Sequence, residues 1–256
     1  MENHYDRKYK SNSKAKHEGF ILVWLIGFLP LFFTAFTLLY TTTTQIELKS
    51  VLHQTCRTEL LKIQETAAHH IQSLMAVNKL VDIANWAQFL TALSTIILIP
   101  FPFLAPIVET IFLKTKSVRE AIPLIQKAII TNLRVTLTNG LWQTQRKLQL
   151  IIKNYKNKTS ALWLIERAQV IGIPPLSLAI EAESPRSGLS KYRLKKNFSH
   201  LQSLTLSWNY STARHSLFHT LAGWNQSFSG QCSATLEQEE PWNAVLYADK
   251  FSLKPL

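Results

Sequence analysis

The chain has 256 residues, which is enough for one or two domains of ordinary size, and 46% of them are hydrophobic. Its formal net charge of +12 comes without zinc-finger spacing or an aromatic RNA-binding motif, so we expect no nucleic-acid partner. No nucleophile elbow, phosphate-binding loop, zinc-protease motif or dinucleotide fingerprint occurs, which excludes the enzyme classes that those motifs mark. We therefore expect no catalysis, no metal and no cofactor.

The first predicted element is a membrane anchor at residues 19–40. No charged side chain occurs in residues 19–46, and a helix of 22 residues at 1.5 Å each can cross a hydrocarbon core of about 30 Å. The span is longer than the apolar part of a cleaved signal, so we expect it to stay attached. Pro30 is expected to kink it. Residues 1–18 are expected to be a cytoplasmic tail because they carry Arg7, Lys8, Lys10, Lys14 and Lys16.

Residues 41–156 are predicted to be a helical region. Between residues 45 and 83, apolar side chains recur at three- and four-residue steps, which predicts a long amphipathic helix. The β-branched run from Thr41 to Thr44 is expected to loosen its junction with the anchor. A second helix is expected to begin near Ser117, an N-cap residue type with Glu120 three positions later. Asn139-Gly140 predicts a turn or a break in that helix.

A second apolar segment occupies residues 83–113 within this region. Its length permits another crossing, but Pro100, Pro102 and Pro106 each remove an amide donor and disturb a helix. The alternatives are a full crossing, a re-entrant or interfacial hairpin, and a buried segment packed against residues 45–81. Basic residues that follow the segment would place that side in the cytoplasm: Lys114, Lys116, Arg119 and Lys127.

Residues 157–256 are predicted to form a mixed α/β or β-rich domain. Period-two alternation occurs in four short runs, and Pro, Gly, Ser and Asn punctuate the intervening sequence. The runs are residues 176–181, 204–208, 232–236 and 244–247. The predicted fold class is thus α+β and membrane-anchored, with an N-terminal transmembrane helix, a long helical stalk and a small β-rich C-terminal domain.

The two cysteines, Cys56 and Cys232, have two interpretations. In an oxidising compartment they can pair, and loop-closure entropy gives such a link about 4–5 kcal/mol. In a reducing compartment they are buried thiols. A bond between them requires the stalk and the C-terminal domain to lie on one side of the membrane.

Histidines and acidic residues offer no convincing site. His53 and Cys56 lie one helical turn apart, but a structural zinc normally needs four ligands. His69-His70 and the pair His215 and His219 are interpreted as surface residues. Glu237, Glu239 and Glu240 are interpreted as a solvated turn.

A family resemblance rests first on the opening EGFILVWLIGFLPLFFTAFTLLY. It resembles the N-terminal anchor of Tad-type (tight-adherence, Flp pilus) assembly proteins of the TadE/TadG kind, which have a basic stub, a Gly-led apolar helix and a Pro near its middle. Lys14, Lys16, Gly19 and Pro30 match that pattern. Further matches resemble predatory-bacterium members: Cys56-Arg57, Leu60, Gln64, Leu74–Asn78, Trp208, Cys232, Trp242 and Asp249-Lys250.

The resemblance implies a minor-pilin-like or assembly component of a bacterial pilus or envelope complex, without catalysis. It would sit in the inner membrane, with its C-terminal domain in the periplasm and with lipid and other complex subunits as partners. Gly19-Phe20 resembles a prepilin processing junction, although pilins usually carry Glu at the fifth mature position, where this chain has Trp24. The alternative function is a two-span subunit of a membrane transport or secretion complex with a cytoplasmic C-terminal domain.

Overall fold

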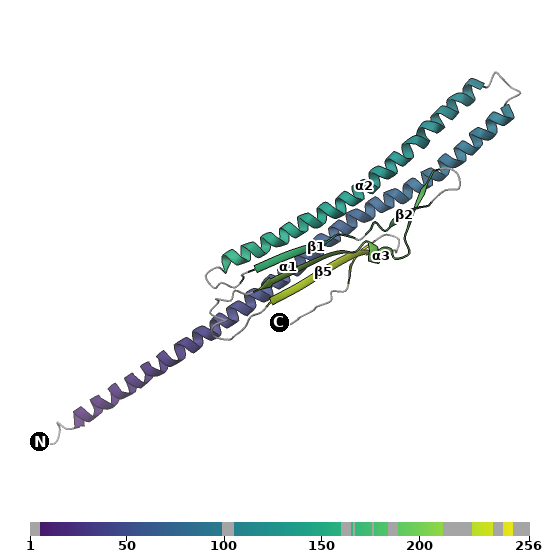
Figure 1. Ribbon diagram of the computed structural model, residues 1–256. Helices are drawn as coiled ribbons and strands as arrows, with labels where there is room; N and C mark the ends of the chain where they lie inside the picture. The colour runs from purple at the N-terminus through teal and green to yellow at the C-terminus, as the bar shows by residue number, and fades with distance from the viewer. Residues whose placement is uncertain are drawn as a thin grey trace.

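A long antiparallel helical hairpin carries a small β-sheet along one side (Figure 1). The computed structural model describes residues 6–98, 105–159, 165, 167–175, 177–183, 189–211, 227–237 and 243–247, and the described side chains of α1 begin at Leu22. The first helix, α1 (Asp6–Leu98), extends well beyond the second helix and the sheet at its N-terminal end. The order of an apolar N-terminal helix, a helical region and a small β domain is as predicted.

Helix α1 is continuous over 93 residues, including Pro30 and the threonine run. The threonine hydroxyls donate to backbone carbonyls three or four residues earlier: Thr41 to Leu38 at 2.9 Å and Thr44 to Tyr40 at 2.7 Å. Such bonds satisfy the hydroxyl groups inside the helix. The predicted loosening at residues 41–44 is therefore wrong, and the apolar N-terminal segment is coaxial with the stalk.

The second helix, α2 (Ala105–Lys158), begins earlier than predicted and has no break at residues 139–140. Ser117 is not an N-cap, since it lies inside the helix and its hydroxyl donates to the Lys114 carbonyl at 3.1 Å. Gly140 is a packing residue: a Cβ there would lie 2.7 Å from Cγ1 of Ile63 on α1. The glycine lets the two helices approach closely.

The hairpin core is a stripe of buried apolar side chains on α1 that faces α2 and the sheet. On α1 it includes Leu52, Leu60, Ile71 and Leu74, all fully buried, and Leu133, Leu137 and Leu148 meet it from α2. Two members of the predicted apolar stripe, Ile46 and Leu80, are exposed instead.

The main sheet is antiparallel with strand order β1-β4-β5-β6. Its strands are β1 (Arg167–Ile173), β4 (Leu204–Ser211), β5 (Ser227–Glu237) and β6 (Asn243–Tyr247). Every second residue of β4 is buried against the hairpin, from Leu204 to Tyr210. Trp208 lies opposite Gly230 of β5, where an added Cβ would come within 2.5 Å of its indole ring.

Two further strands and a short helix complete the described fold. Strands β2 (Ile180–Glu183) and β3 (Lys191–Leu194) form an antiparallel pair beside α1, and α3 (Phe198–Leu201) leads into β4. The predicted strand at 176–181 is therefore only partly right, while strands were correctly predicted at 204–208, 232–236 and 244–247.

Residues 83–98 and 105–113 do not fold back on residues 45–81, and most of their side chains are exposed. They extend the two helices beyond the sheet and form the distal end of the hairpin, with residues 99–104 outside the described part (Figure 1). The chain before this segment packs against the chain after it, through α1 with α2 and α1 with β5. A single crossing that puts those parts on opposite sides of a membrane is incompatible with this packing.

Candidate functional site

The first functional candidate is the apolar N-terminal part of α1, residues 22–40. Its large side chains are exposed in every direction, with Phe32 77% and Phe36 68% accessible. Hydroxyls in it are satisfied by the helix itself, since Thr37 donates to the Phe33 carbonyl at 2.8 Å. Among the described helices, α1 is the one long and apolar enough to cross a membrane, with mean hydropathy 2.2 over its best window and none of that window buried. Length and composition suit a membrane anchor or a signal sequence.

The second candidate is the distal end of the hairpin, residues 83–98 and 105–113, which we call the hairpin tip. At its base, a small cluster of Val77, Val81, Ala84 and Ile122 closes the contact between the helices. Within the tip, large apolar side chains of both helices are exposed, and they include Ile83, Trp86, Phe89, Leu90, Ile96, Ile97, Ile107, Ile111, Phe112 and Leu113.

The polarity of α1 reverses where the tip begins. In the stalk, which is the part of α1 between Tyr40 and Ile83, most leucines face inward and the charged residues face solvent. In the tip, Thr91 is buried, and Gln88 bonds to Arg119 of α2 across the hairpin. The outer face presents apolar side chains such as Trp86 and Leu90 instead, 65% and 59% exposed. Polar groups inside and apolar groups outside are the arrangement of a surface that meets something other than water.

The two apolar ends are held far apart by the stalk. From Tyr40 to Ile83, α1 rises by about 65 Å at 1.5 Å per residue. The described chain between these points is one uninterrupted helix, braced by α2 and the sheet. The two apolar surfaces therefore lie at opposite ends of a rod.

The disulfide between Cys56 and Cys232 links the sheet covalently to the stalk. The Cα atoms of the two cysteines are 6.3 Å apart. Gln64, fully buried two turns further along α1, donates from Nε2 to the carbonyls of Gln202 at 2.7 Å and Ala234 at 3.1 Å. His53 meets the edge of the Trp208 ring at the same junction. These contacts make a structural joint between α1 and β5.

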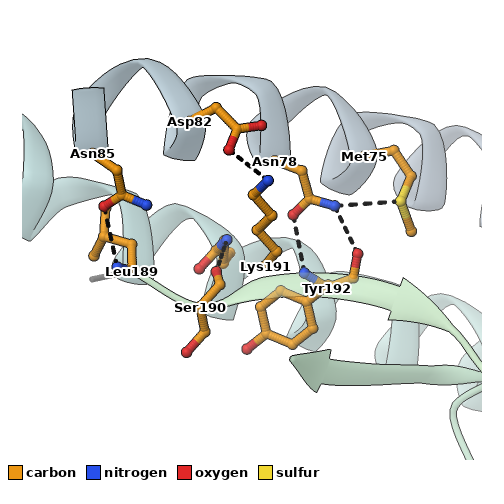
Figure 2. Close-up of polar contacts among 9 residues, drawn as sticks. Met75, Asn78, Asp82, Asn85, Leu189, Ser190, Lys191 and Tyr192 are labelled. Carbon is orange, nitrogen blue, oxygen red and sulfur yellow. Dashed lines mark hydrogen bonds and ion pairs between the residues drawn. The ribbon is translucent and has the colours of Figure 1, made fainter. Parts of the chain in front are cut away.

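A second joint binds the lead-in of β3 to the upper stalk (Figure 2). Asn78 pairs with the backbone of Tyr192, Asn85 accepts from the Leu189 amide at 3.3 Å, and Asp82 forms a 2.5 Å ion pair with Lys191. These α1 residues are spaced four and three apart, so they share one helical face. The face acts as a polar docking strip for residues 189–192.

A basic cleft of about 860 Å³ lies between the C-terminal part of α2 and β1. Lys153, Lys156 and Arg167 line it, with the amide of Asn209 and the hydroxyl of Ser211. It is close to the end of the rod that carries residues 22–40, since Tyr155 of α2 donates to Glu47 of α1 at 2.9 Å. Its chemistry suits contact with anionic groups.

The histidines that the sequence analysis considered for a metal site do not form one in the described structure. Cys56 is in the disulfide, His70 contacts the Thr136 hydroxyl at 3.3 Å, and His69 is exposed. No group of three or more His, Cys, Asp or Glu side chains gathers in the part of the chain that the structure describes. His215, His219, Glu239, Glu240 and Trp242 lie outside the described residues.

The possible processing junction lies within α1. Gly19 and Phe20 precede the first described side chain, so their role stays a prediction. Comparison of the chain with family models, with curated proteins and with solved structures gave no match.

Proposed function

We propose that this chain is a non-enzymatic, membrane-anchored structural or assembly component of a bacterial Tad-like pilus or envelope complex, of the minor-pilin kind. The observation that carries the proposal is the exposed apolar helix of residues 22–40, which continues without a break into the stalk. An anchor built this way transmits the position of the membrane rigidly to the sheet.

The proposed orientation puts the N-terminus in the cytoplasm and the sheet in the periplasm. The basic tail of residues 1–18 supports the first half, because basic flanks stay on the cytoplasmic side. The disulfide between Cys56 and Cys232 supports the second half, because such bonds persist in oxidising compartments. The proposed location is therefore the inner membrane.

The resemblance to TadE/TadG proteins supports the choice of complex. Four of the matching residues, Cys56, Gln64, Trp208 and Cys232, meet at one joint between α1 and the sheet. Residues that carry the resemblance and also meet in space are consistent with a shared structural joint. Lipid and other subunits of the complex are the proposed partners.

The alternative function, a two-span transport subunit with a cytoplasmic C-terminal domain, finds less support. It needs residues 45–81 and the sheet on opposite sides of a membrane. The disulfide and the packing of β5 on α1 join those two parts.

A deletion and complementation experiment in the encoding bacterium tests the proposal. We expect deletion to remove surface filaments in electron micrographs, and the full chain to restore them. A chain in which a cleavable secretion signal replaces residues 1–40 should fold but fail to restore them, because the rod is released from the membrane. The matched control replaces residues 19–40 with an unrelated single-span helix and should restore them. Filaments that persist after deletion would contradict a role in the pilus.

A further inference from the structure

We propose that the hairpin tip inserts into a lipid bilayer other than the one that holds the anchor, so that the chain bridges two membranes. The inference rests on the proposed function for the anchor and extends it to the opposite end of the rod. Its basis is the composition, the polarity and the position of the tip.

The tip has a lipid-facing surface rather than a narrow protein-docking stripe. The outward side of α1 presents Trp86, Leu90, Leu93 and Ile97 at four- and three-residue steps, and Ile107 and Ile111 continue the surface on α2. The inward side carries Gln88 and Thr91. A helical pair with small and polar residues between its helices and apolar residues outside matches the packing of helices in membranes.

The hydroxyl groups of the tip need no water. Thr91 donates to the Ala87 carbonyl at 2.9 Å, Ser94 to Thr91 at 2.8 Å, and Thr110 to Pro106 at 2.8 Å. A polar group satisfied inside its own helix can enter hydrocarbon without leaving a bare donor. A site for a protein partner would instead be expected to offer free polar groups at its rim.

Charge sets the depth of insertion. Between Ile83 and Leu113, Glu109 is the single charged residue of the sequence, and Lys114 and Lys116 follow directly. Residues 105–113 of α2 rise by about 12 Å, which is close to one leaflet of a hydrocarbon core of about 30 Å. The lysines would then lie at the level of anionic headgroups, which attract them. Because Gln88 of α1 contacts Arg119 of α2, Trp86 and Leu90 lie beside these lysines in the headgroup region, and the later residues of α1 enter the hydrocarbon together with residues 105–113. The tip thus enters one leaflet and does not cross.

The length of the rod prevents the tip from reaching the membrane that holds the anchor. With the anchor upright in a bilayer, the continuous α1 carries Ile83 about 65 Å from Tyr40 along the helix axis. A flat membrane cannot reach both ends of an upright rod of this length. The lipid that covers the tip must belong to a second membrane.

A two-membrane flotation assay tests the inference. The full chain is inserted by its anchor into lipid nanodiscs and mixed with separate protein-free vesicles of phosphatidylethanolamine and phosphatidylglycerol. We expect the loaded nanodiscs to float with the vesicles. The Leu90→Glu, Ile97→Glu double variant should reduce this at least tenfold. The matched control, Val135→Glu with Leu150→Glu, adds the same charges at exposed apolar positions of the stalk and should float as wild type.

Lipid-restricted quenching identifies which membrane the tip contacts. Both native cysteines are in the disulfide, so Ala92→Cys at the tip and Thr138→Cys on the stalk each give one labelling site. Brominated lipid present only in the vesicles should quench a fluorophore at position 92 and spare one at position 138.

Four other results of the flotation and quenching experiments would overturn the inference. Quenching at position 92 by brominated lipid of the nanodisc would put both apolar ends in one membrane. Tip-dependent dimers without vesicle flotation would make a second copy the partner. If the chain enters nanodiscs but the nanodiscs never float with the vesicles, the proposal of a second membrane is wrong and the proposed anchor is unaffected. If it does not enter nanodiscs, the proposed anchor fails as well.

Discussion

The side-chain amide of Asn78 on α1 bonds the backbone of Tyr192 in both directions, with Nδ2 donating to the carbonyl at 2.7 Å and Oδ1 accepting from the amide at 3.0 Å. The side chain thereby takes the place of a neighbouring strand for β3 (Figure 2). We expect Asn78→Ala to lower the free energy of unfolding by about 2 kcal/mol, because two backbone groups lose their partner.

The neighbouring ion pair supplies the control for Asn78. Asp82 and Lys191 are 53% and 39% exposed, and exposed pairs contribute about 1 kcal/mol or less. Asp82→Ala should therefore cost less than Asn78→Ala in urea unfolding, and Asn78→Ala alone should speed hydrogen exchange at the Tyr192 amide. Equal effects of the two substitutions would contradict the role given to Asn78.

The close approach of Gly140 to Ile63 predicts an unusual response to alanine. In an exposed helix, Gly→Ala stabilises by about 1 kcal/mol, but here the new Cβ would lie 2.7 Å from Cγ1 of Ile63. We expect Gly140→Ala to destabilise the protein and to become favourable when combined with Ile63→Ala. The double-mutant cycle should give a coupling energy of at least about 1 kcal/mol, and additive effects would show that the helices are not in contact there.

The sequence predicts an element of this fold when the signal lies in the element's own residues, and it fails when a contact with a distant part of the chain determines the structure. The apolar run of residues 19–40 and the alternation of residues 204–208 carry their own structural signal, so both elements were predicted. Gly140 was interpreted as a break because its partner Ile63 lies on the other helix. Strand β1 was missed because Val170 is the one residue in it that is buried, which leaves no alternating pattern.

The candidate functional surfaces also differ in how far the sequence predicts them. The apolar N-terminal helix follows from composition alone, and Cys56 and Cys232 are the only possible intramolecular pair of cysteines in this sequence. The hairpin tip does not follow, because the apolar segment with its three prolines left open a full crossing, a re-entrant or interfacial hairpin, and a buried segment packed against residues 45–81. Only the packing of α1 on α2 decides among them. The docking strip of Asn78, Asp82 and Asn85 has a visible helical spacing but no sequence signal for its partner.

The buried Tyr210 predicts a loss of stability in alkali. Burial raises the pKa of Tyr210 to about 12, from 10.0. A raised pKa favours the protonated folded state fully below pH 10, and that stability is lost as the pH rises from 10 towards 12. The two-unit shift corresponds to about 3 kcal/mol.

Tyr210→Phe isolates this contribution. Among the described residues the Tyr210 hydroxyl has no hydrogen-bond partner, so the substitution should cost little at pH 7. It should also flatten the fall in unfolding free energy between pH 10 and 12. A variant that loses stability in alkali as steeply as wild type would exclude Tyr210 as the cause.

The disulfide predicts sensitivity to reductant. Cys56 and Cys232 are 176 positions apart, and a link over so long a loop stabilises by about 4–5 kcal/mol through the unfolded chain. We expect dithiothreitol to shift the urea midpoint downward in wild type and to have no effect on a Cys56→Ser, Cys232→Ser double variant. An unchanged wild-type midpoint would contradict a stabilising bond.

The most direct test of the account is the side of the membrane on which the sheet lies. Paired reporters fused after Leu256 measure it in cells: alkaline phosphatase is active outside the cytoplasm, where it forms its disulfides, and green fluorescent protein fluoresces inside. The account predicts an active phosphatase fusion, a dark fluorescent-protein fusion, and both fusions in the membrane fraction. A fluorescent fusion with inactive phosphatase would place the sheet in the cytoplasm and contradict the account.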